Sequence, residues 1–168
     1  MISFRDYEYF KEEIELALIQ NACVEIELYS IIASIIRESK NQCKLSVRDV
    51  SNRRKSDISK RYYGDAGFPD FVVLKREKDS NAKIYGCIEA KMPTKPLLDE
   101  NDKQVKGHIN FFGKVIYTNG FHWKFFDNSK KNEPCDIILG YMQGSEIVWY
   151  PQENWDKLLN KIDNIKWY

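Results

Sequence analysis

Three charged residues in the middle of the chain have the types and spacing of a metal-dependent hydrolytic site. Asp70 stands at the start of an apolar run, GFPDFVVL, while Glu89 and Lys91 end a second run, KIYGCIEAK. Burying a carboxylate beside apolar side chains is costly unless a partner compensates its charge. Because strand side chains alternate between faces, Glu89 and Lys91 project from one face, and pairing of the two strands can bring Asp70 beside Glu89.

The chemistry open to such a cluster is hydrolysis of a phosphate ester. Two close carboxylates repel each other unless a cation lies between them, and Mg²⁺ prefers oxygen ligands while keeping several waters of its own. A bound divalent metal polarises a phosphoryl oxygen and makes a bound water more nucleophilic. Lys91 would orient or help to deprotonate that water, or stabilise negative charge on the phosphate.

Each residue alone also has an ordinary explanation. Asp70 fits a turn aspartate before a strand, and Glu89 with Lys91 fits a solvent-facing charged pair on an edge strand. Only the joint pattern of the three residues favours a metal site.

Directly before these runs lies the densest positive segment of the chain, RRKSDISKRYY. Between Arg37 and Tyr63 there are nine Lys or Arg against three Asp or Glu. Contacts to phosphates supply most of the non-specific affinity of proteins for DNA. A solvated loop is the alternative, but the position next to the proposed site favours nucleic-acid binding by the basic residues, which are Arg53, Arg54, Lys55, Lys60 and Arg61.

Hydrophobic periodicity and turn residues predict the elements that position these side chains. The pair Asn119-Gly120 is a strong hairpin turn between two strand-like runs. The expected order of elements predicts an α/β protein with a mixed sheet covered by helices on both faces. Helices are expected at about 4–19, 23–39, 100–112 and from 151 onward, and strands at KLSVRDV, PDFVVLKR, KIYGCIEAK, KVIYT, HWKFFD, CDIILGYM and EIVWY.

Composition excludes several classes of protein. The 168 residues carry a net charge of +1, which names no partner, and no apolar run approaches the roughly 20 residues that span a bilayer. The acidic, amphipathic N-terminus is not a signal peptide. Four cysteines without a CxxC pair argue against a disulfide framework or a zinc site and suit a reducing, cytoplasmic environment. GHINFFGKV has the wrong spacing for a phosphate loop, so the chain carries no NTPase motor.

Pro69-Asp70 and, after an interval of 18 residues, Glu89-Ala90-Lys91 together resemble the core motif of the PD-(D/E)xK nuclease superfamily. Gly67 before the motif, the phrase IEAK, and the segments QVKGH and KVIYTNGFHWKFF resemble more narrowly the N-terminal nuclease domain of type I restriction-enzyme motor subunits. Gln104 matches the glutamine of that domain's Q-x-x-x-Y helix, whereas His108 stands where the tyrosine is usual. The resemblance covers roughly residues 20 to 165.

The resemblance implies a restriction-endonuclease-like, three-layer fold with a central mixed sheet. We expect a single domain over 1–168, with a helical extension at 1–22 and the core at 23–168. The resemblance also implies Mg²⁺-dependent cleavage of DNA, with Mn²⁺ as a substitute metal. Asp70 and Glu89, helped by the carbonyl of Ala90, would hold the metal, and Lys91 would position the attacking water.

The same family places a glutamate on the helix before the strands, where it would hold or orient a second metal or a water. Glu25 and Glu27 are both candidates. At 100° per residue, Glu25 lies about 60° and Glu27 about 100° from the centre of the apolar face, so Glu25 is better directed at the sheet. Gln104 would touch a phosphate of the nucleic acid or support Lys91.

DNA is the expected partner, and the resemblance adds an ATP-dependent motor or specificity subunit on a separate chain. The start at Met1 fits both a stand-alone protein and an excised domain, and a homodimer is left open. Two other classes compete with a nuclease: a catalytically silent DNA-binding or assembly module of a defence or repair complex, and a protein-interaction domain with an incidental charged pair. The intact Asp70, Glu89 and Lys91 argue against the silent module.

Overall fold

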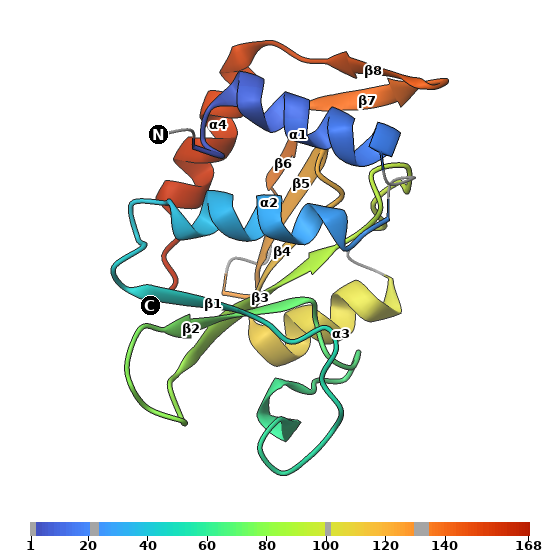
Figure 1. Cartoon of the computed structure of the whole chain (residues 1–168). Coiled ribbons are helices and arrows are strands. Elements are labelled where there is room, and N and C mark those ends of the chain that lie inside the picture. Colours follow the sequence, from blue (N-terminus) through green and yellow to red (C-terminus); the bar gives the residue numbers. More distant parts are fainter. Residues whose placement is uncertain (1–2, 21–23, 100–101, 130–134) are drawn as a thin grey trace.

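Four α-helices and eight β-strands make up the described part of the chain. The computed structural model describes residues 3–20, 24–99, 102–129 and 135–168 (Figure 1). In chain order the elements are α1 Tyr7–Gln20, α2 Glu27–Arg37, β1 Leu45–Asp49, the short 3₁₀ helix η1 Lys60–Tyr62, β2 Phe71–Lys75, β3 Ile84–Ala90, α3 Lys103–Phe112, β4 Lys114–Thr118, β5 His122–Asp127, β6 Cys135–Ile138, β7 Gly140–Gln143, β8 Glu146–Trp149 and α4 Gln152–Asp163.

Six strands form one mixed sheet in the order β1-β2-β3-β4-β5-β6. Strands β3 and β4 run parallel and are joined through α3, because parallel neighbours need a crossover connection. The other neighbours are antiparallel. In the β2–β3 ladder Phe71 pairs with Ile88. Asp70, one residue before β2, therefore comes next to Glu89 near the end of β3.

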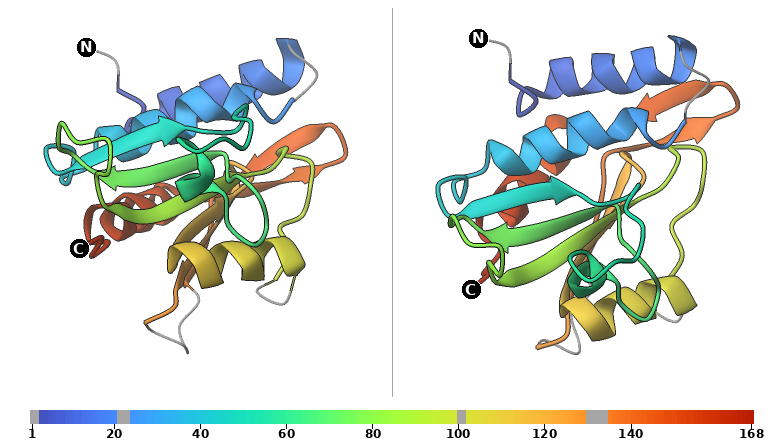
Figure 2. Two further views of the ribbon diagram at one scale, coloured as in Figure 1. Left: turned by 90° about the horizontal axis from the view of Figure 1, so that it is seen from below. Right: turned by 60° about the horizontal axis from the view of Figure 1, so that its bottom comes forward.

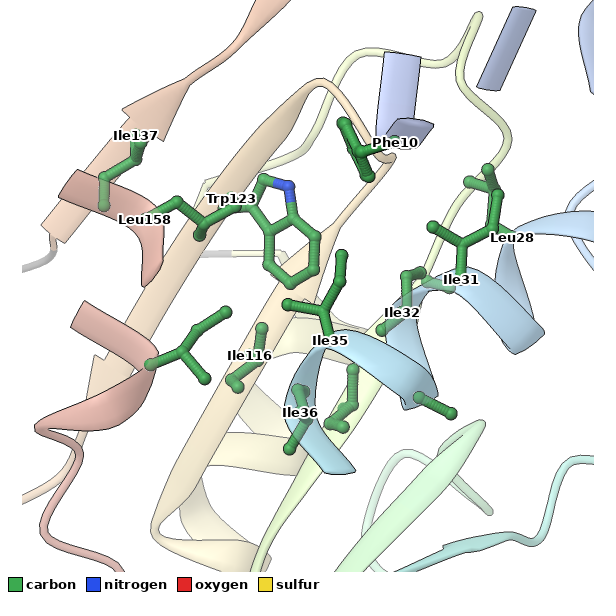
Figure 3. Close-up of a cluster of buried hydrophobic side chains, with 14 of the residues drawn as sticks. Phe10, Leu28, Ile31, Ile32, Ile35, Ile36, Ile116, Trp123, Ile137 and Leu158 are labelled. Carbon is green, nitrogen blue, oxygen red and sulfur yellow. The ribbon is translucent and has the colours of Figure 1, made fainter. Parts of the chain in front are cut away.

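Helices cover both faces of this sheet. Helices α1, α2 and α4 pack on one face and α3 on the other, and Figures 1 and 2 show this layering from different sides. On the first face aliphatic side chains of α2 lie on one side of Trp123 of β5 and Leu158 of α4 on the other, in one buried cluster (Figure 3). On the second face Val105 and Phe112 of α3 pack against the strands. Alternating side chains of the same strands thus supply two separate cores.

The expected α/β architecture, a mixed sheet with helices on both faces, is confirmed. The five runs from KLSVRDV to HWKFFD contain β1 to β5, and the closing helix begins one residue after Pro151. The Asn119-Gly120 pair lies in the turn between β4 and β5, where Gly120 has φ 89°.

Some element boundaries differ from the expectation. The helix expected from residue 23 begins at Glu27, and the helix expected from residue 100 begins at Lys103; both expected starting points lie outside the described residues. Val24, which lies within the helix range expected from the sequence, precedes the observed helix α2 and is exposed.

The run CDIILGYM was expected as one strand but forms two, β6 and β7, in different sheets. Leu139 separates them. Its side chain is fully buried, and its amide donates to the carbonyl of Phe121, so the chain turns into the core at this residue. Periodicity could not locate this break, because the residues on both sides are apolar.

The first helix belongs to the main core. Tyr7, Phe10 and Ile14 of α1 are buried in the same cluster as residues of α2 and α4. The division into an extension at 1–22 and a core from 23 stays a prediction. Like every other described helix, α1 is not long and apolar enough to cross a membrane.

Candidate functional site

Asp70 lies buried at the start of β2, with 8% of its surface exposed. The backbone N–H of Ala90 donates to its Oδ2 at 2.7 Å, and the hydroxyl of Tyr29 donates to its Oδ1. Ala90 ends β3, whereas Tyr29 belongs to α2. Two elements that are distant in the sequence therefore hold this carboxylate in place.

Glu89 is more deeply buried, with 4% of its surface exposed. Lys91 Nζ lies 2.6 Å from Oε1, and the amide of Gln104 donates to the same oxygen at 2.6 Å. His108 Nε2 lies 3.3 Å from Oε2, which is within ion-pair range. Even so, Oε2 and both ring nitrogens have no hydrogen-bond partner within the described residues. One oxygen of Glu89 is thus well satisfied and the other is not.

The two carboxylates differ in their electrostatics. The pKa of Asp70 is raised to about 7. Burial is the largest cause and the charge of Glu89 the next, while the hydrogen bonds from Tyr29 and Ala90 act in the opposite direction. Burial alone would also raise the pKa of Glu89, but its contacts with His108 and Lys91 outweigh burial and hold that pKa below its usual value. Burial tends to lower the pKa of Lys91, whereas the charge of Glu89 raises it above its usual value. At neutral pH Glu89 and Lys91 are therefore ionised, whereas Asp70 is only partly ionised, because its pKa is close to 7.

Helix α3 approaches the loop before β2 closely because two glycines leave room. The side chain of Asp102 caps α3 by accepting from two amides of its first turn. A Cβ at Gly107 would lie 2.8 Å from the Cβ of Ala66, and one at Gly64 would lie 2.7 Å from the side chain of Phe111. Glycine is the residue that permits such close contact. The approach places Gln104 and His108 of α3 against the end of β3.

The two candidate glutamates have different surroundings. Glu25 lies in the turn before α2, and its charge adds to burial and to Glu89 in raising the pKa of Asp70. Glu27, the first residue of α2, lines a hollow between α1 and α2 together with Glu13. The charge of Glu25 thus acts on Asp70, but the helical spacing that favoured Glu25 does not apply, because α2 begins only at Glu27. The choice between the two glutamates stays a prediction.

The basic segment, residues 53–61, lies between β1 and β2 beside α3 in Figures 1 and 2. Arg53, Arg54 and Lys55 are exposed. Lys60 is also exposed and lies 3.4 Å from the carboxylate of Asp57. These four side chains are open to a polyanion on the same side of the sheet as α3.

Arg61 has a different environment from its neighbours. Its guanidinium donates to the backbone carbonyls of Ser80 and Ala82, in the connection between β2 and β3. It also lies over the ring of Tyr62, at 5.2 Å from the ring centre. Arg61 thus ties the basic segment to the sheet.

Sequence reasoning missed two residues of this cluster, Tyr29 and His108. Each stands four residues after a residue that was singled out, Tyr29 after Glu25 and His108 after Gln104. Residues four apart share one face of a helix, so the spacing from Gln104 was the available signal for His108. Glu25 precedes α2 and gives no such signal for Tyr29. Their actual contacts depend on how α2 and α3 pack against the sheet.

As a metal-binding group the cluster is small. No set of three or more His, Cys, Asp or Glu side chains in the described ranges is arranged to hold a metal ion. The carboxylates of Asp70 and Glu89 are a two-residue donor set. Mg²⁺ is commonly bound by one or two carboxylates and completes its coordination with water, so the two oxygens suit such an ion.

Comparison with known proteins supports the fold. No family model matches the sequence, and no curated protein is detectably similar to it. One solved structure, a cryoEM structure of a DrdV–DNA complex, matches with a TM-score of 0.59 at 16% sequence identity. The match covers 98% of this chain and 14% of that one. The two chains share a fold, and this chain corresponds to a small part of the larger protein.

Proposed function

We propose that this chain is a divalent-metal-dependent nuclease domain of the PD-(D/E)xK type that hydrolyses phosphodiester bonds of DNA. The observation that carries the proposal is the buried pair of Asp70 and Glu89 at the ends of adjacent strands, with Lys91 on the second carboxylate. Burial of two neighbouring carboxylates is unfavourable without a cation, and the raised pKa of Asp70 is the electrostatic sign of that cost.

The donor set fits a hard divalent cation. Asp70, Glu89 and the carbonyl of Ala90 would hold Mg²⁺ or Mn²⁺, and Glu89 Oε2 is a buried oxygen without a hydrogen-bond partner in the described structure. A bound ion supplies polarisation of a phosphoryl oxygen and a more nucleophilic water.

The protein's own groups do the remaining work. Lys91, whose ammonium is held at Glu89, orients the attacking water and stabilises negative charge on the phosphate. Glu25, whose charge acts on Asp70, would hold or orient a second metal or a water. Gln104 keeps Glu89 oriented through its hydrogen bond to Oε1.

DNA as the substrate is supported by two independent features. The basic segment offers exposed Arg53, Arg54 and Lys55 on the same side of the sheet as α3. In addition, the protein of similar fold was solved in complex with DNA. This chain matches 14% of that protein's chain. From the sequence resemblance, the proposal also includes a separate ATP-dependent motor or specificity subunit as partner.

A second candidate function is a DNA-binding module without cleavage. The specific observation in its favour is that Lys91 and Gln104 already satisfy Glu89 Oε1 without a metal. Such a module would bind DNA through the basic segment and leave it intact.

Cleavage and binding assays separate the two candidates. The wild type should cut supercoiled, linear or single-stranded DNA with Mg²⁺ or Mn²⁺ but not with EDTA. Lys91→Ala should abolish cutting and leave DNA affinity unchanged. Salt-sensitive DNA binding without cutting under any metal, tested also with added motor subunits, would support the silent module instead.

The basic segment has its own test. The triple substitution of Arg53, Arg54 and Lys55 by alanine should weaken DNA binding, and it should reduce the slope of log affinity against log salt by about 2 to 3. Lys40→Ala is the control. It removes one surface charge outside the basic segment, because Lys40 is an exposed lysine beyond the end of α2. An unchanged slope in the triple variant would contradict DNA binding by this segment.

A further inference from the structure

The side chain of His108 is fully buried, yet the proposed chemistry gives it no task. It lies on α3 one turn after Gln104, and both side chains are directed at Glu89. Gln104 contacts Oε1 at 2.6 Å and His108 Nε2 lies 3.3 Å from Oε2. The helix therefore touches both oxygens of one carboxylate.

A buried imidazole with no hydrogen-bond partner for either nitrogen is unusual, because buried polar groups are nearly always paired. Among the described residues, neither these nitrogens nor the opposing oxygen, Glu89 Oε2, has a hydrogen-bond partner. The ring also packs beside Phe112, with ring centres 5.9 Å apart, so the imidazole has little freedom to turn elsewhere. Its Nε2 lies 3.3 Å from Oε2 of Glu89, so this carboxylate is the polar group that the structure places against the ring.

We propose that His108 is a positioning residue that, with Gln104, clamps Glu89 in the orientation needed to hold the divalent metal. This inference rests on the proposed function and adds a role for α3 in it. Lys91 and Gln104 share Oε1, so when Lys91 turns to the substrate, Gln104 and His108 still restrain one oxygen each. Residues that orient a metal ligand from behind commonly change metal affinity about 10- to 100-fold when removed.

The clamp also explains why the close approach of α3 matters. The loop before β2 and α3 meet at Gly107 and Ala66, one residue before His108. The same contact that brings the helix to this distance sets how far the imidazole stands from Glu89. The orientation of the carboxylate is thus linked to packing of α3 on the sheet.

The test measures Mn²⁺ binding to the whole chain without DNA, by electron paramagnetic resonance of the free ion and by calorimetry. His108→Leu should weaken Mn²⁺ binding about 10- to 100-fold. His108→Gln, which keeps a polar nitrogen facing Oε2, should recover most of the affinity. His122→Leu is the matched control, because His122 is the other histidine of the chain. It lies on β5 and contacts Asp136 of β6.

A double-mutant cycle shows whether His108 acts through Glu89. In the background of Glu89→Gln, His108→Leu should cause no further loss of Mn²⁺ affinity. An equal loss in both backgrounds would overturn the positioning role, and so would unchanged affinity in a folded His108→Leu protein. If this variant does not fold, His108→Asn, whose shorter side chain is withdrawn from Oε2, is carried through the same cycle, with the same two outcomes deciding the question.

Three outcomes separate the role of His108 from the metal site itself. Strong ¹⁴N coupling from an imidazole to the bound Mn²⁺, lost in His108→Gln, would identify a direct metal ligand and overturn the positioning role. If the wild type binds no Mn²⁺, or if neither Asp70→Asn nor Glu89→Gln weakens the binding, the proposed metal site itself is wrong. If Mn²⁺ binding depends on both carboxylates but is unchanged in His108→Leu, the positioning role of His108 is wrong and the metal site stands.

Discussion

Replacing Asp70 by asparagine should make the metal-free protein more stable at pH 8. The pKa of this carboxyl is about 7 in the folded protein, against a usual value of 3.8. A raised carboxyl pKa means that the folded state binds the proton more tightly than the unfolded state. The stability contribution is therefore full below about pH 4 and is lost as the pH rises through about 7.

The magnitude follows from the size of the shift. A rise of about three in the pKa corresponds to a loss of roughly 4 kcal/mol in the free energy of unfolding above pH 7, as an upper limit for a group that is nearly fully buried. Asparagine keeps the volume but cannot accept both hydrogen bonds, from Ala90 and Tyr29, which costs about 1 to 2 kcal/mol. We expect a net stabilisation of about 2 kcal/mol at pH 8, and none at pH 4.

Urea unfolding, monitored by tryptophan fluorescence in EDTA between pH 4 and 8, measures the free energy of unfolding of both proteins and its dependence on pH. The free energy of unfolding of the wild type should fall more steeply with pH than that of Asp70→Asn. Asp57→Asn is the control, because its side chain is 98% exposed. Parallel pH profiles for wild type and Asp70→Asn would refute the assignment of a raised pKa to Asp70.

The same proton makes metal binding depend on pH. A metal ion needs the ionised carboxylate, so binding below pH 7 releases the proton of Asp70. Mn²⁺ affinity should rise about tenfold per pH unit up to about pH 7 and level off above it. A flat profile from pH 5 to 8, measured by calorimetry, would be inconsistent with Asp70 as a ligand.

Three substitutions around the site give further predictions. Tyr29→Phe removes a hydrogen bond that lowers the pKa of Asp70, so the rise in Mn²⁺ affinity should move to higher pH by about 0.5 to 1 unit in calorimetry. Arg61→Ala leaves two backbone carbonyls without their donor and should lower the free energy of unfolding by about 1 to 3 kcal/mol in urea, with little change in DNA affinity. Gly107→Ala forces a Cβ against Ala66 and should destabilise the protein by about 1 to 3 kcal/mol in thermal unfolding, whereas Lys106→Ala on the exposed side of α3 should not.

Local patterns in the sequence were enough to predict most of the sheet and the course of the chain around Asp70 and Glu89. The apolar runs that became β2 and β3 have strand composition, and hairpin pairing of neighbouring runs follows from their short connection. Asn119-Gly120 marks the β4–β5 turn for the same local reason, since Gly120 adopts a positive φ. Gly67, which stands before Pro69-Asp70, has φ 94° and likewise shapes its turn from within the segment.

Local patterns failed where a residue's neighbours come from distant parts of the chain. The break at Leu139 depends on its burial and on hydrogen bonds with Tyr7 of α1 and with Phe121 before β5, which no window of sequence contains. Arg61 looked like its basic neighbours, because charge density does not reveal that its guanidinium reaches the β2–β3 connection. Histidine at 108 looked like a departure from a motif rather than a contact of Glu89.

The sequence by itself determined which residues are available for chemistry, because residue type, strand period and the spacing from Asp70 to Lys91 are local properties. The tertiary structure decided which of them meet. Tyr29 reaches Asp70 only because α2 packs across the sheet, and Gln104 and His108 reach Glu89 only because Gly107 lets α3 settle against Ala66. The raised pKa of Asp70 likewise exists only in the folded protein, because burial and the neighbouring charge of Glu89 arise when the strands pair.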